Sequence, residues 1–205
     1  MSDFLNKVIQ KISLKWTIVF TILFIVFFIL INFSGIGVAG LLKITGGPNI
    51  LDFEFGYNRN EAYQMLTALR NEGRSFYLTR ILPIDFIFPL SYMLLYFGWI
   101  AFLIKHIHGI CNNCSFVKHN RIYKYLLFIP ILATFFDFIE NIGIISMLIN
   151  YPDLPLWAVI MASNAGKLKT IFTVGSVSVI IILIGILTYK RILRKRKLSN
   201  TSIVK

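Results

Sequence analysis

The sequence has few charged residues, and almost all of them lie outside four long stretches. Only nine of the 205 residues are Asp or Glu, and charged residues of both signs make up 15% of the chain. Residues 16–42, 86–104 and 170–189 contain no Asp, Glu, Lys or Arg, and residues 125–150 contain only Asp137 and Glu140. A helix that crosses the hydrocarbon core of a membrane needs about 20 mostly apolar residues. Four such stretches argue against a soluble globular protein and predict four transmembrane helices.

Several other features are missing, and each absence excludes a class of protein. No period of 20–50 residues repeats, so the chain is not a solenoid or a repeat array. No Gly-rich phosphate-binding loop is present, and no Ser–His or Cys–His pair accompanies the acidic residues of the spans, so nucleophilic catalysis has no support. The four spans and one long loop use nearly the whole chain, which leaves no room for a separate soluble catalytic domain.

These patterns predict an all-α membrane protein, a four-helix transmembrane bundle that forms a single integral membrane domain over residues 1–205. The spans are expected at about 16–42, 83–105, 122–149 and 168–190, and the small residues at the end of the first span, such as Gly35 and Ala39, are expected to let a neighbouring helix pack closely. In the loop after the first span, Asn58 and Glu61 resemble a capping box, and Gly73 resembles a C-cap. An amphipathic helix at about 59–72 is therefore expected to lie across the outer mouth of the bundle. Two further short helices are expected at the membrane surface, one ahead of the first span around Phe4–Ile12 and one at Leu156–Ala162.

The net charge of +12 is explained by membrane topology rather than by nucleic-acid binding. In the predicted topology, 14 basic residues lie on the side of the two termini and 7 lie on the other side. Basic residues near the ends of spans favour the cytoplasm. We therefore expect a multi-pass protein of the cell membrane with both termini cytoplasmic, its basic tail in contact with anionic lipid headgroups. No nucleic-acid recognition module accompanies the charge, so no nucleic-acid partner is expected. Homo-oligomerisation is left open.

Polar residues inside the second and third spans form the candidate site. Asp85 lies near the outer end of the second span, and Asp137, Glu140 and Asn141 lie in the outer half of the third span, so the four reach similar depth. Tyr92, Tyr96 and Trp99 share the helical face of Asp85 at spacings of seven, eleven and fourteen residues. An ionisable group within a span is expensive, so these faces are expected to meet inside the bundle and to serve a function.

Three uses suit this cluster. The favoured one is the binding of a small apolar or cationic ligand in a pocket open to the outer leaflet, with the four polar side chains as its contacts and the three aromatic residues as its wall. The second is a membrane enzyme that uses paired carboxylates for acid/base chemistry on a lipid or isoprenoid. The third is a structural or assembly role, in which the acids form ion pairs with rim bases: Arg74, Arg80, Lys167 and Lys169. Transport is disfavoured because the inner halves of the spans are apolar.

The chain has only two cysteines, Cys111 and Cys114, in the loop after the second span. His106, His108 and His119 flank them, so two Cys and two His, with His108 and His119 as the histidines, could hold a tetrahedral zinc ion. The C-x-x-C spacing also allows a redox pair, and the simplest alternative is a loop with two free thiols. The predicted cytoplasmic placement argues against a stable disulfide. No cofactor is expected otherwise.

Three groups of residues resemble the pattern of a known family. They are Gly56-Tyr57, Glu61-Ala62, Gly73-Arg74 and Tyr77 in the loop, Asp85-x-x-Phe88-Pro89-x-x-Tyr92, and Phe136-Asp137-x-x-Glu140-Asn141. Over about residues 55–185 the chain resembles a family of uncharacterised four-span prokaryotic integral membrane proteins. This resemblance implies the architecture and the importance of these positions, and it supplies no chemistry. A weaker, architectural likeness links the chain to sterol-isomerase and sigma-2-like four-helix membrane proteins, which place acidic and aromatic residues around an apolar pocket.

Overall fold

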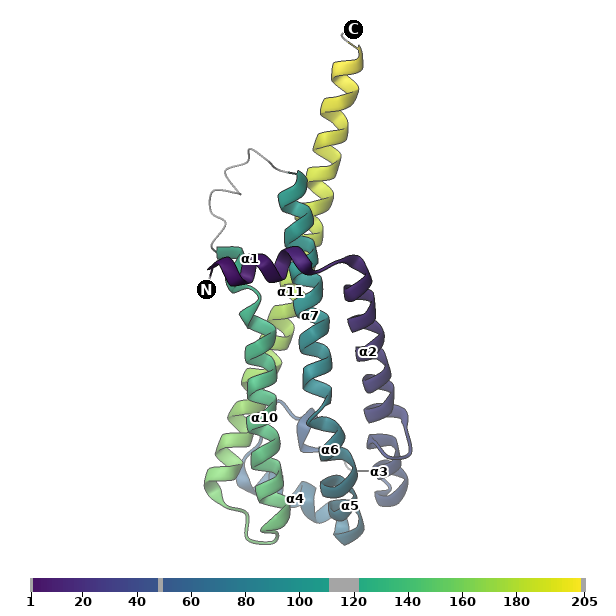
Figure 1. Ribbon diagram of the computed structural model, residues 1–205. Coiled ribbons are helices and arrows are strands. Elements are labelled where there is room, and N and C mark those ends of the chain that lie inside the picture. The colour runs from purple at the N-terminus through teal and green to yellow at the C-terminus, as the bar shows by residue number, and fades with distance from the viewer. Residues whose placement is uncertain (1, 48–49, 111–121, 204–205) are drawn as a thin grey trace.

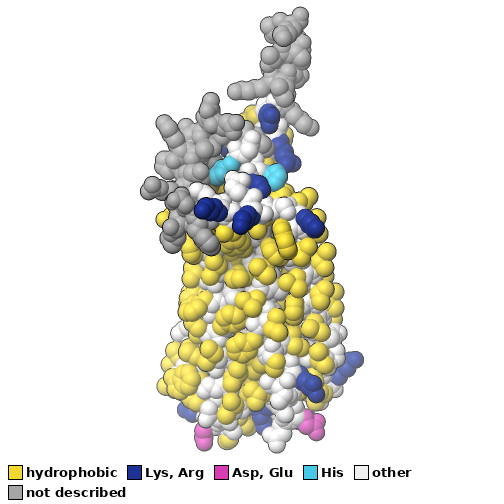
Figure 2. All heavy atoms as spheres, in the orientation of Figure 1, with side chains coloured by type: hydrophobic (Ala, Val, Ile, Leu, Met, Phe, Trp, Pro, Cys, Tyr) yellow, Lys and Arg dark blue, Asp and Glu magenta, His cyan; other side chains and the backbone are white. Residues whose placement is uncertain are grey.

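The computed structural model describes residues 2–47, 50–110 and 122–203, and this part of the chain is helical with no strand. Four segments are long and apolar enough to cross a membrane: Leu14–Thr45, Arg70–Gly109, Phe128–Ile149 and Leu156–Arg194. They run side by side as a bundle (Figure 1), and a broad band of apolar side chains covers the face seen in Figure 2. The protein is therefore an all-α integral membrane protein with four spans, as the sequence predicts.

A short helix, α1 (Ser2–Lys11), crosses one end of the bundle and is held there by the second span (Figure 1). Leu5 and Ile9 are buried in an apolar cluster that includes Ile104 of α7 (Phe88–Ile110). The Lys105 ammonium donates hydrogen bonds to the carbonyls of Gln10 at 2.7 Å and Ile12 at 3.0 Å. These are carbonyls that the last turn of a helix leaves without an intrahelical donor, so Lys105 acts as a C-terminal cap supplied from another helix.

The first span is interrupted, where the sequence predicts one helix over 16–42. It consists of α2 (Leu14–Phe33) and α3 (Val38–Thr45), separated by a turn at residues 34–37. A Cβ atom on Gly37 would overlap the backbone of Ile31, and one on Gly40 would overlap the backbone of Gly35. The glycines therefore allow a tight turn within the span, whereas the sequence predicts close packing with another helix at Gly35.

A cap covers the other end of the bundle, and its boundaries differ from the prediction. It contains a 3₁₀ turn, η1 (Leu51–Phe53), followed by α4 (Arg59–Ala68), which begins with the expected capping box between Asn58 and Glu61. The helix ends at Ala68, not near 72, because Arg70 adopts a positive φ of 57° that breaks it. Gly73 does not end a helix. It lies buried inside the next one, α5 (Arg70–Phe76), against Thr45 and Leu41 of α3.

The second span begins earlier than predicted and is discontinuous. Helix α5 continues through a π-helical turn, η2 (Tyr77–Ile81), into α6 (Leu82–Asp85), and the chain departs from helix at residues 86–87 before α7 begins. The third span is α10 (Phe128–Ile149), preceded by a single turn, α9 (Ile122–Tyr125). The fourth, α11 (Leu156–Ile203), is one helix of 48 residues. The prediction of a separate interfacial helix at Leu156–Ala162 is therefore wrong, because this segment is the first two turns of α11.

Helices α7, α10 and α11 pack against one another, whereas α2 packs mainly against α7. Two apolar clusters fill the bundle. Side chains of the cap and of the adjoining ends of α10 and α11 form the first cluster. Side chains of α1 and of the opposite halves of α7 and α11 form the second. The predicted polar residues of the second and third spans lie between these two clusters.

Candidate functional site

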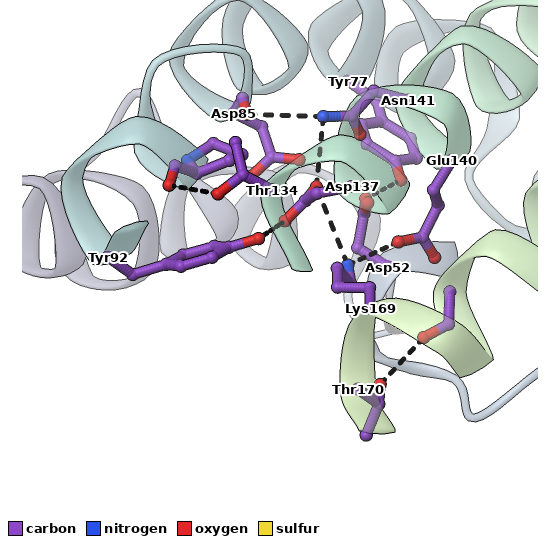
Figure 3. A network of polar contacts seen from close by, with 12 residues as sticks. Asp52, Tyr77, Asp85, Tyr92, Thr134, Asp137, Glu140, Asn141, Lys169 and Thr170 are labelled. Atoms are coloured by element: carbon purple, nitrogen blue, oxygen red, sulfur yellow. Dashed lines mark hydrogen bonds and ion pairs between the residues drawn. The ribbon is translucent and has the colours of Figure 1, made fainter. Parts of the chain in front are cut away.

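The four polar residues that the sequence places at one depth do come together. Asp85, Asp137, Glu140 and Asn141 are all buried, with exposed fractions of 7%, 3%, 0% and 0%. The Asn141 amide joins two of the others: its Nδ2 donates to the Asp85 backbone oxygen at 3.3 Å and to Asp137 Oδ1 at 3.4 Å. Figure 3 shows the resulting network between α6, α7, α10 and α11.

A proline explains why Asn141 bonds to the backbone at Asp85. In a continuous helix the carbonyl of Asp85 would accept from the N–H four residues later, but residue 89 is proline and has no N–H. Proline is tolerated in membrane helices where a neighbour satisfies the freed carbonyl. Asn141 supplies that donor from α10, and Thr134, also on α10, donates to the Pro89 carbonyl at 3.0 Å. The proline four residues after Asp85 and the side-chain donors Asn141 and Thr134 of α10 therefore belong to one contact between the second and third spans.

Lys169 of α11 supplies positive charge to the site. Its Nζ lies 2.5 Å from Glu140 Oε2 and 3.9 Å from Asp137 Oδ1. The other Asp137 oxygen, Oδ2, accepts a hydrogen bond from the Tyr92 hydroxyl at 2.8 Å. A Cβ atom on Gly166 would overlap the Glu140 carboxylate, so glycine at this position on α11 allows the carboxylate to pack against the helix.

Two residues of the cap also belong to the site: Asp52, which sequence reasoning missed, and Tyr57, which only the family resemblance singled out. Asp52 of η1 accepts a hydrogen bond from the Tyr77 hydroxyl of the π-helical turn. The Tyr57 backbone N–H donates to Ser163 Oγ of α11 at 2.9 Å, and the Tyr57 ring is 8% exposed. Burial raises the pKa of the Tyr57 hydroxyl above its ordinary value, and the nearby carboxylates of Glu140 and Asp52 raise it further. The sequence gives one signal for a buried position of Asp52, which is that it lies between two apolar residues, Leu51 and Phe53.

Of the four predicted rim bases, Lys169 is the one that forms ion pairs with the acids of the network in the described part of the chain. The Arg74 guanidinium donates to the Leu66 carbonyl at 2.8 Å and lies 3.9 Å from the centre of the Tyr151 ring, so it fastens the cap. Arg80 is exposed in a shallow groove with Glu72 and Phe76. Lys167 lies against Gly56.

A cavity of about 250 Å³ opens beside the network. Tyr92, Asp137 and Lys169, which are joined by a hydrogen bond and an ion pair, form its polar end, and the hydroxyl-bearing Thr170 and Thr173 also line it. Aromatic and aliphatic side chains form the rest of the wall: Phe24 and Phe28 of α2, Phe88 and Tyr96 of α7, and Val174 of α11. Because Phe28 and Val174 are exposed on the apolar surface of the bundle, the cavity opens sideways between α2 and α11.

Trp99 is the one predicted wall residue that does not line this cavity. Its Nε1 donates to Thr21 Oγ1 of α2 at 3.2 Å, and its ring packs edge-on against Phe102. Seven residues separate Trp99 from Tyr92 on α7, a spacing that puts both on one side of a helix. The spacing could not show that α2 covers this part of the face.

The predicted zinc ligands Cys111, Cys114 and His119 lie outside the described residues, while His108 is near the end of α7. Within the described ranges, no group of three or more His, Cys, Asp or Glu side chains is arranged to hold a metal ion. The zinc prediction therefore stays a prediction.

Comparisons with known proteins give no further identification. No family model, curated protein or solved structure matches this chain. The interpretation of the site consequently depends on its own geometry.

Proposed function

We propose that this membrane protein binds a small lipophilic molecule that carries one neutral hydrogen-bonding head, such as a hydroxyl, in the lateral cavity between α2 and α11. The supporting observation is the composition of that cavity, which has Asp137, Lys169 and Tyr92 at one end and aromatic side chains along the rest. Binding sites for small ligands are mostly apolar with a few convergent polar groups. The head would lie at the polar end, and the tail would follow Phe24 and Phe28 towards the lipid.

The same geometry favours an apolar ligand over a cationic one. The Lys169 ammonium already lies at the polar end of the cavity and forms ion pairs with both Glu140 and Asp137. The ammonium of a cationic ligand would be repelled by that of Lys169, because the repulsion between like charges is strong where water is excluded. A hydroxyl can accept from Lys169 and donate to Asp137, so it complements both charges.

The proposed orientation places the cavity in the outer leaflet. Helix α1 and the C-terminal part of α11 lie at one end of the bundle, and the cap of α4 and α5 lies at the other (Figure 1). The basic asymmetry of the sequence favours a cytoplasmic position for the α1 end. The site lies nearer the cap, so the ligand would be recruited from the outer leaflet of the cell membrane.

Photolabelling of the full-length protein in nanodiscs tests the proposal. The probes are a diazirine-bearing long-chain alcohol and the amine of the same chain length. The alcohol is expected to label peptides of α2 or α11 that line the cavity, and the amine to label them several-fold less. Thr173→Trp fills the cavity and should abolish this labelling, whereas Val177→Trp, on the lipid-facing surface of α11 outside the cavity, should not. Equal labelling of both variants would contradict the proposal.

The short ion pair between Lys169 and Glu140 favours a second candidate, a purely structural network that fixes the register of α10 against α11. In that case the cavity has no ligand and the acids serve only to pack the bundle. The membrane-enzyme alternative uses the same cavity, with Asp137 as the carboxylate that faces it.

A further inference from the structure

Several buried oxygen atoms of the network have no hydrogen-bond partner among the described residues. They include Asp85 Oδ2 and Asn141 Oδ1, which belong to side chains that are 7% and 0% exposed. Buried polar groups are almost always paired, so an acceptor without a donor indicates an unobserved partner. The Asn141 Nδ2 donates to the Asp85 backbone oxygen and to Asp137, while Asn141 Oδ1 receives no donor among the described residues.

The formal charge of the network points to the nature of that partner. Four carboxylates, those of Asp52, Asp85, Asp137 and Glu140, lie in or next to the network, and among the described residues Lys169 is the one base that contacts it. Uncompensated charge is costly within a membrane. Lys169 is engaged with Glu140 and Asp137 and forms no ion pair with Asp85 in the described structure. Asp52 and Asp85 are therefore the two carboxylates of this group without an ion pair in the described structure, and of these two Asp52 accepts the Tyr77 hydroxyl whereas Asp85 is the more deeply buried.

The backbone at Asp85 is also irregular, although the Asp85 carbonyl already accepts from Asn141 Nδ2. Helix α6 ends at Asp85, and the span is irregular at residues 86–87 before α7 starts. The C-terminal end of a helix carries a partial negative charge. In membrane proteins with broken helices, unwound carbonyls and half-helix C-terminal ends coordinate Na⁺ or H⁺. Asp85 ends α6 and is hydrogen-bonded through its carbonyl to Asn141, and each of these two residues carries one unpaired side-chain oxygen.

We propose that a small monovalent cation of the Na⁺ class binds at this break, with Asp85 Oδ2 and Asn141 Oδ1 as its side-chain ligands. Hard oxygen ligands suit such an ion. A divalent ion would call for more carboxylates than this position offers, since no three acidic side chains of the described residues are arranged to hold a metal. The ion would supply the charge that Lys169 does not provide to Asp85. This site is separate from the lateral cavity, which Asp85 does not line, and the inference does not depend on the proposed lipophilic ligand.

Thermal unfolding of the full-length protein in detergent, at fixed pH and ionic strength, tests the inference. Replacing choline chloride with NaCl is expected to raise the unfolding midpoint by several degrees and to saturate, because a ligand that binds only the folded state stabilises it by mass action. Asp85→Asn keeps the shape of the side chain but removes its charge, and it should abolish the Na⁺ effect. Asp153→Asn, at an exposed acid in the loop between α10 and α11, should retain it.

Direct binding keeps the inference testable if Asp85→Asn does not fold. Equilibrium binding of ²²Na⁺ to the wild-type protein should give about one ion per chain and should be competed by NaCl but not by choline. A midpoint that changes with pH but is the same in NaCl and choline chloride would show that protons alone neutralise Asp85, and would overturn the proposal. An equal Na⁺ effect in Asp85→Asn would overturn it as well.

Discussion

The Asn141 side-chain amide donates to the Asp85 backbone carbonyl, at 3.3 Å, in place of the N–H that Pro89 lacks. This one hydrogen bond connects the break in the second span to the polar face of the third. It also fixes where the Asp85 carboxylate and the Asn141 oxygen lie relative to Asp137.

Replacement of Asn141 should therefore be destabilising, and a second substitution should partly reverse the effect. Asn141→Leu leaves the Asp85 carbonyl without its donor, and an unsatisfied buried group costs about 1–3 kcal/mol. Pro89→Ala restores an N–H four residues after Asp85, so the double variant should lose less stability than the sum of the two single variants. A double-mutant cycle of unfolding free energies in detergent measures this coupling. Asn150→Leu, at the exposed residue that follows α10, serves as the control. Additive losses would disprove the relationship.

The two acids that contact Lys169 should respond differently to neutralisation. Glu140→Gln removes the partner at 2.5 Å and leaves the buried ammonium poorly compensated, so a loss of about 3–5 kcal/mol is expected. Asp137→Asn removes the partner at 3.9 Å and keeps a hydrogen-bonding side chain for Tyr92, so the protein should stay folded while labelling by the alcohol probe is lost. Thermal unfolding and photolabelling of both variants provide the two measurements. A large loss of stability in Asp137→Asn that is rescued by Lys169→Met would favour the purely structural network.

Gly166 should tolerate no side chain, because Glu140 occupies the space where a Cβ would lie. Gly166→Ala is expected to displace the Glu140 carboxylate from Lys169 and to lower the unfolding midpoint by several degrees. Gly185→Ala, on the same helix but with open space around the added methyl group, should be neutral or slightly stabilising since Ala favours helix over Gly. Similar midpoints for the two variants would show that the contact with Glu140 carries little energy.

The topology prediction can be tested at the cysteine loop. If both termini are cytoplasmic, Cys111 and Cys114 should react with a membrane-permeant maleimide but not with an impermeant one in intact cells. A cysteine introduced at exposed Asp153, in a variant with both native cysteines replaced by serine, should show the opposite accessibility. Labelling of the native cysteines by the impermeant reagent would reverse the assigned orientation.

The zinc prediction has its own measurement. Cys111→Ser combined with Cys114→Ser is expected to leave folding intact, because the short polar loop that the sequence predicts there would contribute little to the packing of the bundle. Elemental analysis of the purified wild-type protein gives the complementary result. Stoichiometric zinc that is lost in the double variant, together with a fall in stability, would establish a structural metal site.

The apolar runs predicted the four spans, because a helix must have a minimum length to cross a membrane. Helical spacing predicted that Asp85 and Asn141 lie close together, because polar groups within spans are costly to expose to lipid. They named Lys169 as one of four rim bases that could pair with the acids, but they did not distinguish it from Arg74, Arg80 and Lys167. Its position in the network follows from α11 beginning at Leu156, earlier than the charge pattern indicated. The turn at residues 34–37 was missed for a related reason. Hydropathy does not depend on backbone geometry, so a glycine that allows a tight turn cannot be told from one that lets two helices approach closely.

The peripheral position of α2 has a kinetic consequence. On one side the cavity is lined by Phe24 and Phe28 of α2, which packs mainly against α7. On the opposite side it is lined by α11, which packs against both α7 and α10. Widening the entrance therefore requires only the separation of α2 from α7, where Trp99 is hydrogen-bonded to Thr21. Loosening that contact should shorten the residence time of a bound molecule and leave the polar end of the cavity unchanged.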